Sequence, residues 1–175
     1  MLWEVMLFLG VTVSSILGHP YIDAIKHYEG FSPKVYTCPA GKKTVGYGHV
    51  LSKGEASSLS SISRFQADLL LIQDISKAIF NLEKVAPELF EADDYKLEKV
   101  LAVTSFIFNV GESNFRSSTL LKKIRSKEWS AAANEFLRWN KTTDPKTGTK
   151  VELAGLTKRR QSEALLFSEG KTKIF

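Results

Sequence analysis

Apolar residues recur at helical spacing along most of the chain that follows Pro20. Between residues 65 and 82 they stand three or four positions apart, and Pro87 closes the run, which predicts one long amphipathic helix. Residues 95–110 are apolar on most faces, as expected of a central buried helix. The same spacing predicts shorter helices over 21–29, 118–126, 130–139 and 156–168.

Two segments interrupt this helical pattern. Residues 34–53 are rich in Gly, Pro, Thr, Tyr and Val, and a PAG turn separates VYTC from TVGYGHV, which predicts a small antiparallel hairpin or three-stranded sheet. Residues 141–155, KTTDPKTGTKVELAG, are polar and rich in turn formers and predict a loop. The chain is therefore expected to be α+β, with a small antiparallel β-sheet lobe, a larger helical lobe and a cleft between them.

The N-terminal segment differs from the rest of the chain. Residues 5–18, VMLFLGVTVSSILG, carry no charge, but they are fewer than the roughly 20 residues of a membrane-spanning helix. They fit the apolar part of an export signal or a weak membrane anchor. The residues before them differ from a usual signal, because they include Glu4 and no Lys or Arg. A buried N-terminal helix is the alternative. We expect residues 1–18 to be the signal or anchor, residues 19–175 to be the catalytic domain, and the protein to be exported to the periplasm or cell envelope.

Composition narrows the classes of partner and cofactor. The net charge is +5, and residues 116–175 hold 14 basic against 6 acidic side chains, which suits either an anionic partner or a solvated basic face. No nucleic-acid-binding motif accompanies this charge, so no nucleic-acid partner is expected. Cys38 has no second cysteine to pair with, and His19, His27 and His49 are scattered, so neither an internal disulfide, nor a metal, nor any other cofactor is expected.

Glu29 is the first candidate for chemistry. It closes the predicted helix 21–29, where its negative charge opposes the helix dipole, and Gly30 follows as a stop. Hydrolysis of a glycosidic bond needs a protonated acid on the leaving oxygen and a second group that attacks or activates water. Cys38 and Thr44 follow Glu29 at intervals of nine and six residues and would flank the predicted hairpin turn.

This arrangement resembles the phage-type lysozymes of glycoside hydrolase family 24. Their signature is Glu, eight residues, Asp or Cys, five residues and Thr, which occurs here in IKHYEGFSPKVYTCPAGKKTVGYGH. The resemblance continues through RFQADLLLIQDISKAI, SFIFNVGESNFRSSTLLKKI, WSAAANEFLRWNK and GLTKRRQSEALLF, and so covers about residues 20–168. The spacing of Glu29, Cys38 and Thr44 is weak evidence for the family by itself. Together with these further motifs, the match to the family is specific.

The resemblance implies roles for individual residues. Glu29 would be the catalytic acid, Cys38 would stand where many relatives have Asp to assist water or stabilise positive charge, and Thr44 would orient the attacking water. Phe108 in FNVG and His49 in GYGH are the candidate substrate-binding residues. His49 is expected to support its turn and to transfer no proton. Arg159 or Arg160 would hold Glu29 by charge pairing.

The expected function is that of an endolysin, a monomeric, cofactor-free muramidase that lyses bacterial cells. It would hydrolyse the β-1,4 bonds between N-acetylmuramic acid and N-acetylglucosamine in peptidoglycan, with inversion at the anomeric carbon. A phage or prophage origin follows from the same resemblance. A lytic transglycosylase stays open, because the thiol of Cys38 is mostly neutral at pH 7 and assists water less well than a carboxylate. A non-catalytic protein that binds glycan or membrane on the same fold is the alternative from another class.

Overall fold

The structure is a computed structural model that describes residue 16 and residues 18–38 and 41–175. The expected export or anchor segment lies outside the described residues, apart from Ile16, which is buried, and Gly18. Among the helices of the described part, none is both long and apolar enough to cross a membrane.

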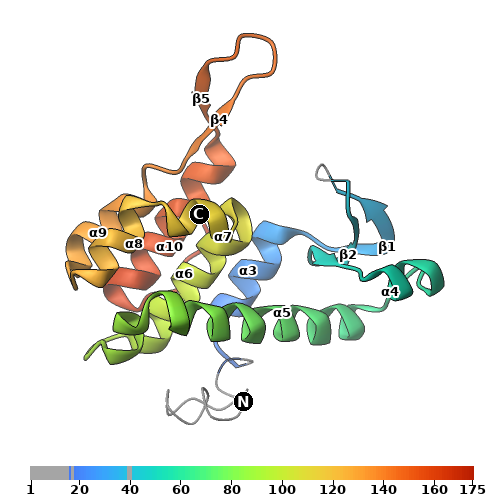
Figure 1. The fold of residues 1–175 in the computed structure, drawn as a ribbon, viewed down its shortest axis with the longest axis horizontal. Coiled ribbons are helices and arrows are strands. Elements are labelled where there is room, and N and C mark those ends of the chain that lie inside the picture. Colours follow the sequence, from blue (N-terminus) through green and yellow to red (C-terminus); the bar gives the residue numbers. More distant parts are fainter. Residues whose placement is uncertain (1–15, 17, 39–40) are drawn as a thin grey trace. The chain divides into compact units, whose positions relative to one another are not determined.

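The chain divides into two compact units. We call residues 14–78 the sheet unit and residues 79–175 the helical unit. Helices dominate the second, whereas the first contains a small antiparallel sheet, so the expected α+β class is confirmed (Figure 1). The two units are described separately below.

The sheet unit contains a three-stranded antiparallel sheet in the order β1-β2-β3. Its helices and strands are α3 (Tyr21–Glu29), β1 (Ser32–Thr37), β2 (Lys43–Gly46), β3 (His49–Val50) and α4 (Lys53–Ser58). The predicted helix 21–29 and the predicted sheet are confirmed. The sheet packs on a small apolar core formed by Val45, Leu51, Ile62 and Ala67.

Helix α4 shows that the predicted sheet was too long at its C-terminal end. Residue 53, expected in the sheet, instead begins this helix. The backbone N–H of Glu55 donates to Ser52 Oγ, and the Ser52 N–H donates to Glu55 Oε2, which together form a capping box. None of the α4 residues is buried, so the helix has no apolar face for sequence periodicity to detect.

The long helix α5 (Arg64–Val85) begins in the sheet unit and ends in the helical unit. The remaining helices are η1 (Pro87–Glu91), α6 (Lys96–Val110), α7 (Glu112–Arg116), α8 (Thr119–Arg125), α9 (Trp129–Phe136) and α10 (Ala154–Glu169). All the predicted helices of this unit are confirmed to within a few residues. The short helices η1 and α7 were not predicted.

Helix α6 supplies the centre of the helical unit, as its apolar composition predicted. Phe106 is fully buried and meets the rings of Phe115, Phe136 and Trp139 edge to face, with centroids 5.4–6.4 Å apart. This geometry is the favourable one for aromatic pairs. Buried residues extend along α6 from Lys99 to Phe106, which gives the unit a rigid central helix.

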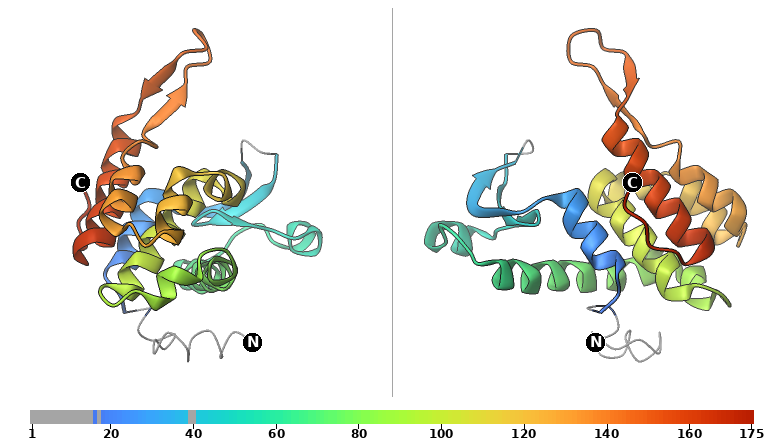
Figure 2. Two further views of the ribbon diagram at one scale, coloured as in Figure 1. Left: turned by 60° about the vertical axis from the view of Figure 1, so that its left-hand side comes forward. Right: turned by 180° about the vertical axis from the view of Figure 1, so that it is seen from behind.

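The prediction for the segment between α9 and α10 was also wrong. It was predicted to be a loop, but it forms an antiparallel hairpin of β4 (Lys141–Thr143) and β5 (Lys150–Glu152). The hairpin extends away from the helices of its unit, and this is visible from several directions (Figures 1 and 2). Asp144 stabilises the turn, because its Oδ1 accepts the Lys146 N–H at 2.7 Å.

Candidate active site

Glu29 is placed by the end of helix α3. The buried face of this helix consists of Tyr21, Ile22, Ala24 and Ile25. Gly30 ends the helix with a φ of +70°, a conformation that favours glycine, and its N–H donates to the Lys26 carbonyl at 3.0 Å. Glu29 is therefore the last helical residue, as predicted, and it is half-buried.

The turn between β2 and β3 lies against the Glu29 carboxyl group. Gly48 in this turn has a φ of +93°, and a Cβ atom added there would lie 3.8 Å from Glu29 Oε2. The positive φ of Gly48 lets the chain turn tightly beside the carboxyl group. The GYGH motif thus contributes to the surroundings of Glu29 through its second glycine.

Cys38 and Thr44 are joined by one backbone carbonyl. The oxygen of Lys42 accepts the Cys38 N–H at 2.9 Å and the Thr44 hydroxyl at 3.1 Å. Thr44 lies in β2 between Tyr36 of β1 and Val50 of β3, and only 2% of it is exposed. The sheet therefore brings these two residues together at the end of the β1–β2 hairpin, as the sequence predicted.

This arrangement determines what the Thr44 hydroxyl can do. A hydroxyl has one hydrogen to donate and two lone pairs that accept. Because the hydrogen of Thr44 is directed to the Lys42 carbonyl, the oxygen acts as an acceptor toward any other partner. An acceptor of this kind is suited to fix the orientation of a water molecule through one of the hydrogens of that water.

His49 is held by a residue that the sequence reading missed. Its Nδ1 lies 2.9 Å from Asp74 Oδ2 on helix α5, and both side chains are partly buried. The pair attaches the GYGH turn, and hence Gly48, to the side of α5. This contact agrees with the expected supporting role of His49, while its part in substrate binding stays a prediction. The sequence contained one indication of a role for Asp74, because it is an acidic residue inside the apolar helical pattern of 65–82.

Phe108 belongs to the helical unit and lies half-buried in the last turn of α6. This position does not test whether Phe108 contacts the substrate, so that contact stays a prediction. The pairing of Arg159 or Arg160 with Glu29 also stays a prediction, because these residues belong to different units.

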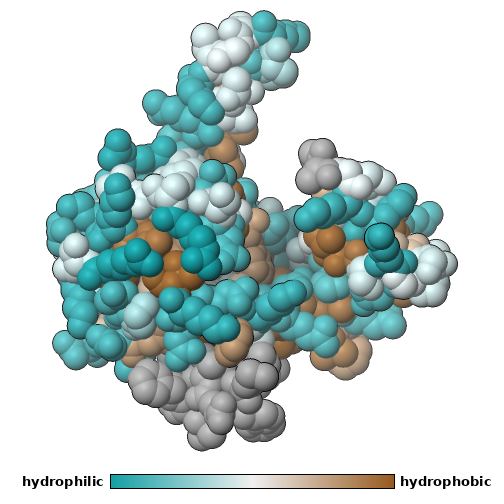
Figure 3. All heavy atoms as spheres, in the orientation of Figure 1, coloured by the Kyte–Doolittle hydropathy of each residue, from teal (hydrophilic) through white to brown (hydrophobic). Residues whose placement is uncertain are grey.

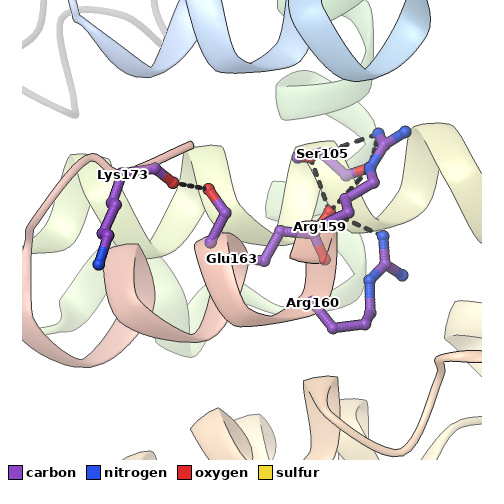
Figure 4. A network of polar contacts seen from close by, with 6 residues as sticks. Ser105, Arg159, Arg160, Glu163 and Lys173 are labelled. Atoms are coloured by element: carbon purple, nitrogen blue, oxygen red, sulfur yellow. Dashed lines mark hydrogen bonds and ion pairs between the residues drawn. The ribbon is translucent and has the colours of Figure 1, made fainter. Parts of the chain in front are cut away.

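Arg159 and Arg160 take part in a buried network within the helical unit (Figure 4). Glu163 Oε1 accepts from Arg159 Nε at 3.1 Å and from Arg160 Nη2 at 2.9 Å. The Ser105 hydroxyl donates to the same oxygen at 2.7 Å and thereby links α10 to α6. Burial raises the pKa of Glu163, and the two guanidinium groups and the Ser105 hydroxyl oppose that shift.

Several exposed basic residues of the helical unit are paired with acidic residues of their own surface. Four ion pairs of 2.6–3.1 Å illustrate this: Arg116–Glu112, Lys123–Glu128, Lys127–Glu91 and Arg138–Glu135. These pairs neutralise part of the positive charge noted in residues 116–175. Within the described residues, no group of three or more His, Cys, Asp or Glu side chains is arranged to hold a metal ion.

Comparison with known proteins supports the resemblance seen in the sequence. The family model of phage lysozyme matches residues 26–163. An endolysin of Acyrthosiphon pisum secondary endosymbiont phage 1 is 38% identical over 147 residues, which cover 82% of this chain and 91% of that protein. An endolysin of Bacillus phage B103 is 36% identical over 154 residues, or 87% of this chain, and the match spans about half of that relative, 54%.

The fold is also similar to that of solved endolysins. The endolysin from Escherichia coli O157:H7 phage FAHEc1 superimposes with a TM-score of 0.71 and 27% identity, covering 90% of this chain and 96% of that one. Sequence and fold thus agree on one assignment. The chain belongs to the phage lysozyme family and is a glycoside hydrolase, a muramidase that hydrolyses bacterial peptidoglycan.

Proposed function

We propose that the sheet unit carries the reacting groups of this muramidase, with Glu29 as the acid and Cys38 and Thr44 as the residues that handle water. The observation that carries the proposal is the shared Lys42 carbonyl. It holds Cys38 and Thr44 together and leaves the Thr44 oxygen as an acceptor. Glu29, in the same unit, lies beside the turn at Gly48.

The proposed reaction uses these three residues in sequence. Protonated Glu29 donates its proton to the glycosidic oxygen as the bond between N-acetylmuramic acid and N-acetylglucosamine breaks. Positive charge develops at the anomeric carbon of N-acetylmuramic acid. Thr44 accepts a hydrogen bond from a water molecule, and the thiolate of Cys38 takes the proton that this water loses as its oxygen bonds to that carbon on the face opposite the leaving group. The product sugar has an inverted configuration, and no cofactor takes part.

Analysis of the cleavage products tests this function. Purified peptidoglycan is digested with the protein, and the new glycan ends are identified by mass spectrometry. A hydrolase adds one water molecule per bond broken and leaves reducing N-acetylmuramic acid ends. An anhydro sugar end would show that a hydroxyl of the substrate attacked instead, and would identify a lytic transglycosylase. No cleavage at all would favour a non-catalytic glycan-binding protein.

We also propose that the protein acts as a monomer in the bacterial envelope and that residues 1–18 direct it into or across the inner membrane. The support is the uncharged run of residues 5–18. We predict that a chain beginning at His19 folds and lyses cell walls that are added from outside. Circular dichroism and a turbidity assay measure the two properties. Aggregation or loss of a cooperative thermal transition would favour the alternative, in which the segment is a packed helix.

A further inference from the structure

The hairpin of residues 141–152, which we call the arm, presents positive charge that its own surface does not neutralise. Lys146 and Lys150 are exposed. Within the described residues, neither ammonium group has a carboxylate at ion-pair distance, and Lys150 Nζ donates to the Thr143 hydroxyl at 2.8 Å. The two acidic residues of the arm are engaged elsewhere. Asp144 accepts backbone N–H groups of its turn, and Glu152 lies 4.0 Å from Lys141.

The shape of the arm is maintained by polar contacts. A two-stranded hairpin without an apolar partner is at best marginally stable in water. In the turn, the hydroxyls of Thr147 and Thr149 are 2.7 Å apart, and the Gly148 N–H donates to the Asp144 carbonyl at 2.8 Å. At the base, the Leu153 N–H donates to the Asn140 carbonyl at 2.9 Å. The lysines are therefore presented on a defined scaffold, not on a free loop.

Exposed basic groups on the helices of the same unit are of two kinds. Several are neutralised by neighbouring acidic groups, as in Arg116–Glu112 and Lys127–Glu91. Lys84, Lys122 and Lys158 are exposed and, like the two lysines of the arm, have no carboxylate at ion-pair distance within the described residues. On the face shown in Figure 3 the surface of the arm is hydrophilic or intermediate toward its tip, although Val151 in β5 is 37% exposed. An apolar protein surface would not be complementary to it. An anionic ligand would be.

We propose that the arm binds the carboxylate groups of the peptide stems of peptidoglycan. This inference rests on the proposed function, because it takes the substrate to be peptidoglycan. The glycan strand carries its negative charge mainly on the attached peptides, since the lactyl carboxyl of N-acetylmuramic acid is consumed in the amide bond to them. Ammonium groups attract such carboxylates, and exposed threonine hydroxyls of the arm can donate to them.

The test compares two charge-matched double variants. Lys146→Gln with Lys150→Gln removes two charges from the arm, while Lys77→Gln with Lys122→Gln removes two exposed charges elsewhere. Rates are measured on purified sacculi free of phosphate polymers and on glycan strands stripped of peptides by an amidase. For the arm variant we expect KM on sacculi to rise about three- to ten-fold with kcat unchanged, since each exposed ion pair has a modest effect. On stripped strands the arm variant should equal the parent.

The remaining outcomes overturn the proposal. An unchanged KM on sacculi, an equal rise for the control variant, or an equal rise on stripped strands would each exclude peptide recognition by the arm. A rise seen only with walls that carry phosphate polymers would assign the arm to those polymers instead. Melting temperatures of both variants should match the parent, because the substituted side chains are exposed. If the parent fails to cleave sacculi, the proposed function fails independently of the arm.

Discussion

In the helical unit, Ser105, Arg159 and Glu163 are buried and bond to one another, and Arg160 completes the network. In the sheet unit, Glu29 and Cys38 are half-buried, and the Thr44 hydroxyl retains acceptor capacity. The first set of polar groups ties two helices together, whereas the second stands at the ends of a helix and a hairpin.

This difference suggests that the first set of residues mainly determines the free energy of unfolding and the second mainly determines the catalytic rate. A buried charge network is expensive to disturb, because removal of one member leaves uncompensated charge in a region without water. Half-buried groups at element ends can be changed with less effect on folding, yet they are the groups that can meet a substrate. We therefore expect variants in the two regions to affect different measurements, and the following predictions run from the largest effect to the smallest.

Glu29→Gln should abolish most of the activity without unfolding the protein. An amide cannot donate a proton to the leaving oxygen, and general acid catalysis is typically worth about 10²–10⁴-fold in rate. Lysis rate and melting temperature are the two measurements. Glu169→Gln is the matched control, because Glu169 also closes a helix but lies exposed at the end of α10. A Glu29→Gln rate above one tenth of the parent would disprove the assignment of the acid.

Glu163→Gln should mainly reduce stability. Two buried guanidinium groups would lose their counter-charge, and the free energy of unfolding should fall by about 3–5 kcal/mol. Urea unfolding measures this change. The exposed pair Arg116–Glu112 provides the control, because Glu112→Gln should cost less than about 1 kcal/mol. A loss below about 1 kcal/mol for Glu163→Gln would mean that its carboxyl group is neutral in the folded protein, and that the network holds no buried ion pair.

Asp74→Asn should have the smallest effect. It removes the charge that faces His49 but keeps a hydrogen-bonding group of the same shape, and the pair is only partly buried. We expect the free energy of unfolding to fall by about 1 kcal/mol. Asp23→Asn serves as control, since Asp23 is 82% exposed and lies 3.9 Å from its partner Lys26. Equal stability of the two variants would show that the His49–Asp74 contact does not hold the turn.

The sequence predicted the elements that bury an apolar face. Helices α5 and α6 were located because their apolar residues repeat at the helical period. Helix α4 was missed because a capping box, not an apolar stripe, defines it. Strands β4 and β5 were missed because polar contacts hold them and their side chains do not alternate between core and solvent.

In the candidate site, too, the sequence predicted some features and not others. The spacing of Glu29, Cys38 and Thr44 identified a family signature. The contacts that organise these residues had no comparable signal. Lys42 acts through its backbone carbonyl, which its side chain does not reveal. Asp74 is 25 residues from His49, so only the folded chain brings the two together.

The central claim is that the residue pair beside the Lys42 carbonyl handles water, and two substitutions of Cys38 test it most directly. Rates on cell walls and melting temperatures are measured together for Cys38→Asp and Cys38→Ala. We predict that Cys38→Asp stays within about ten-fold of the parent, because its carboxylate is ionised at pH 7 and can assist water, while Cys38→Ala loses about 10²-fold or more. A buried structural thiol predicts the reverse: Ala tolerated, and Asp destabilising through an unpaired charge. Full activity of Cys38→Ala would contradict the account.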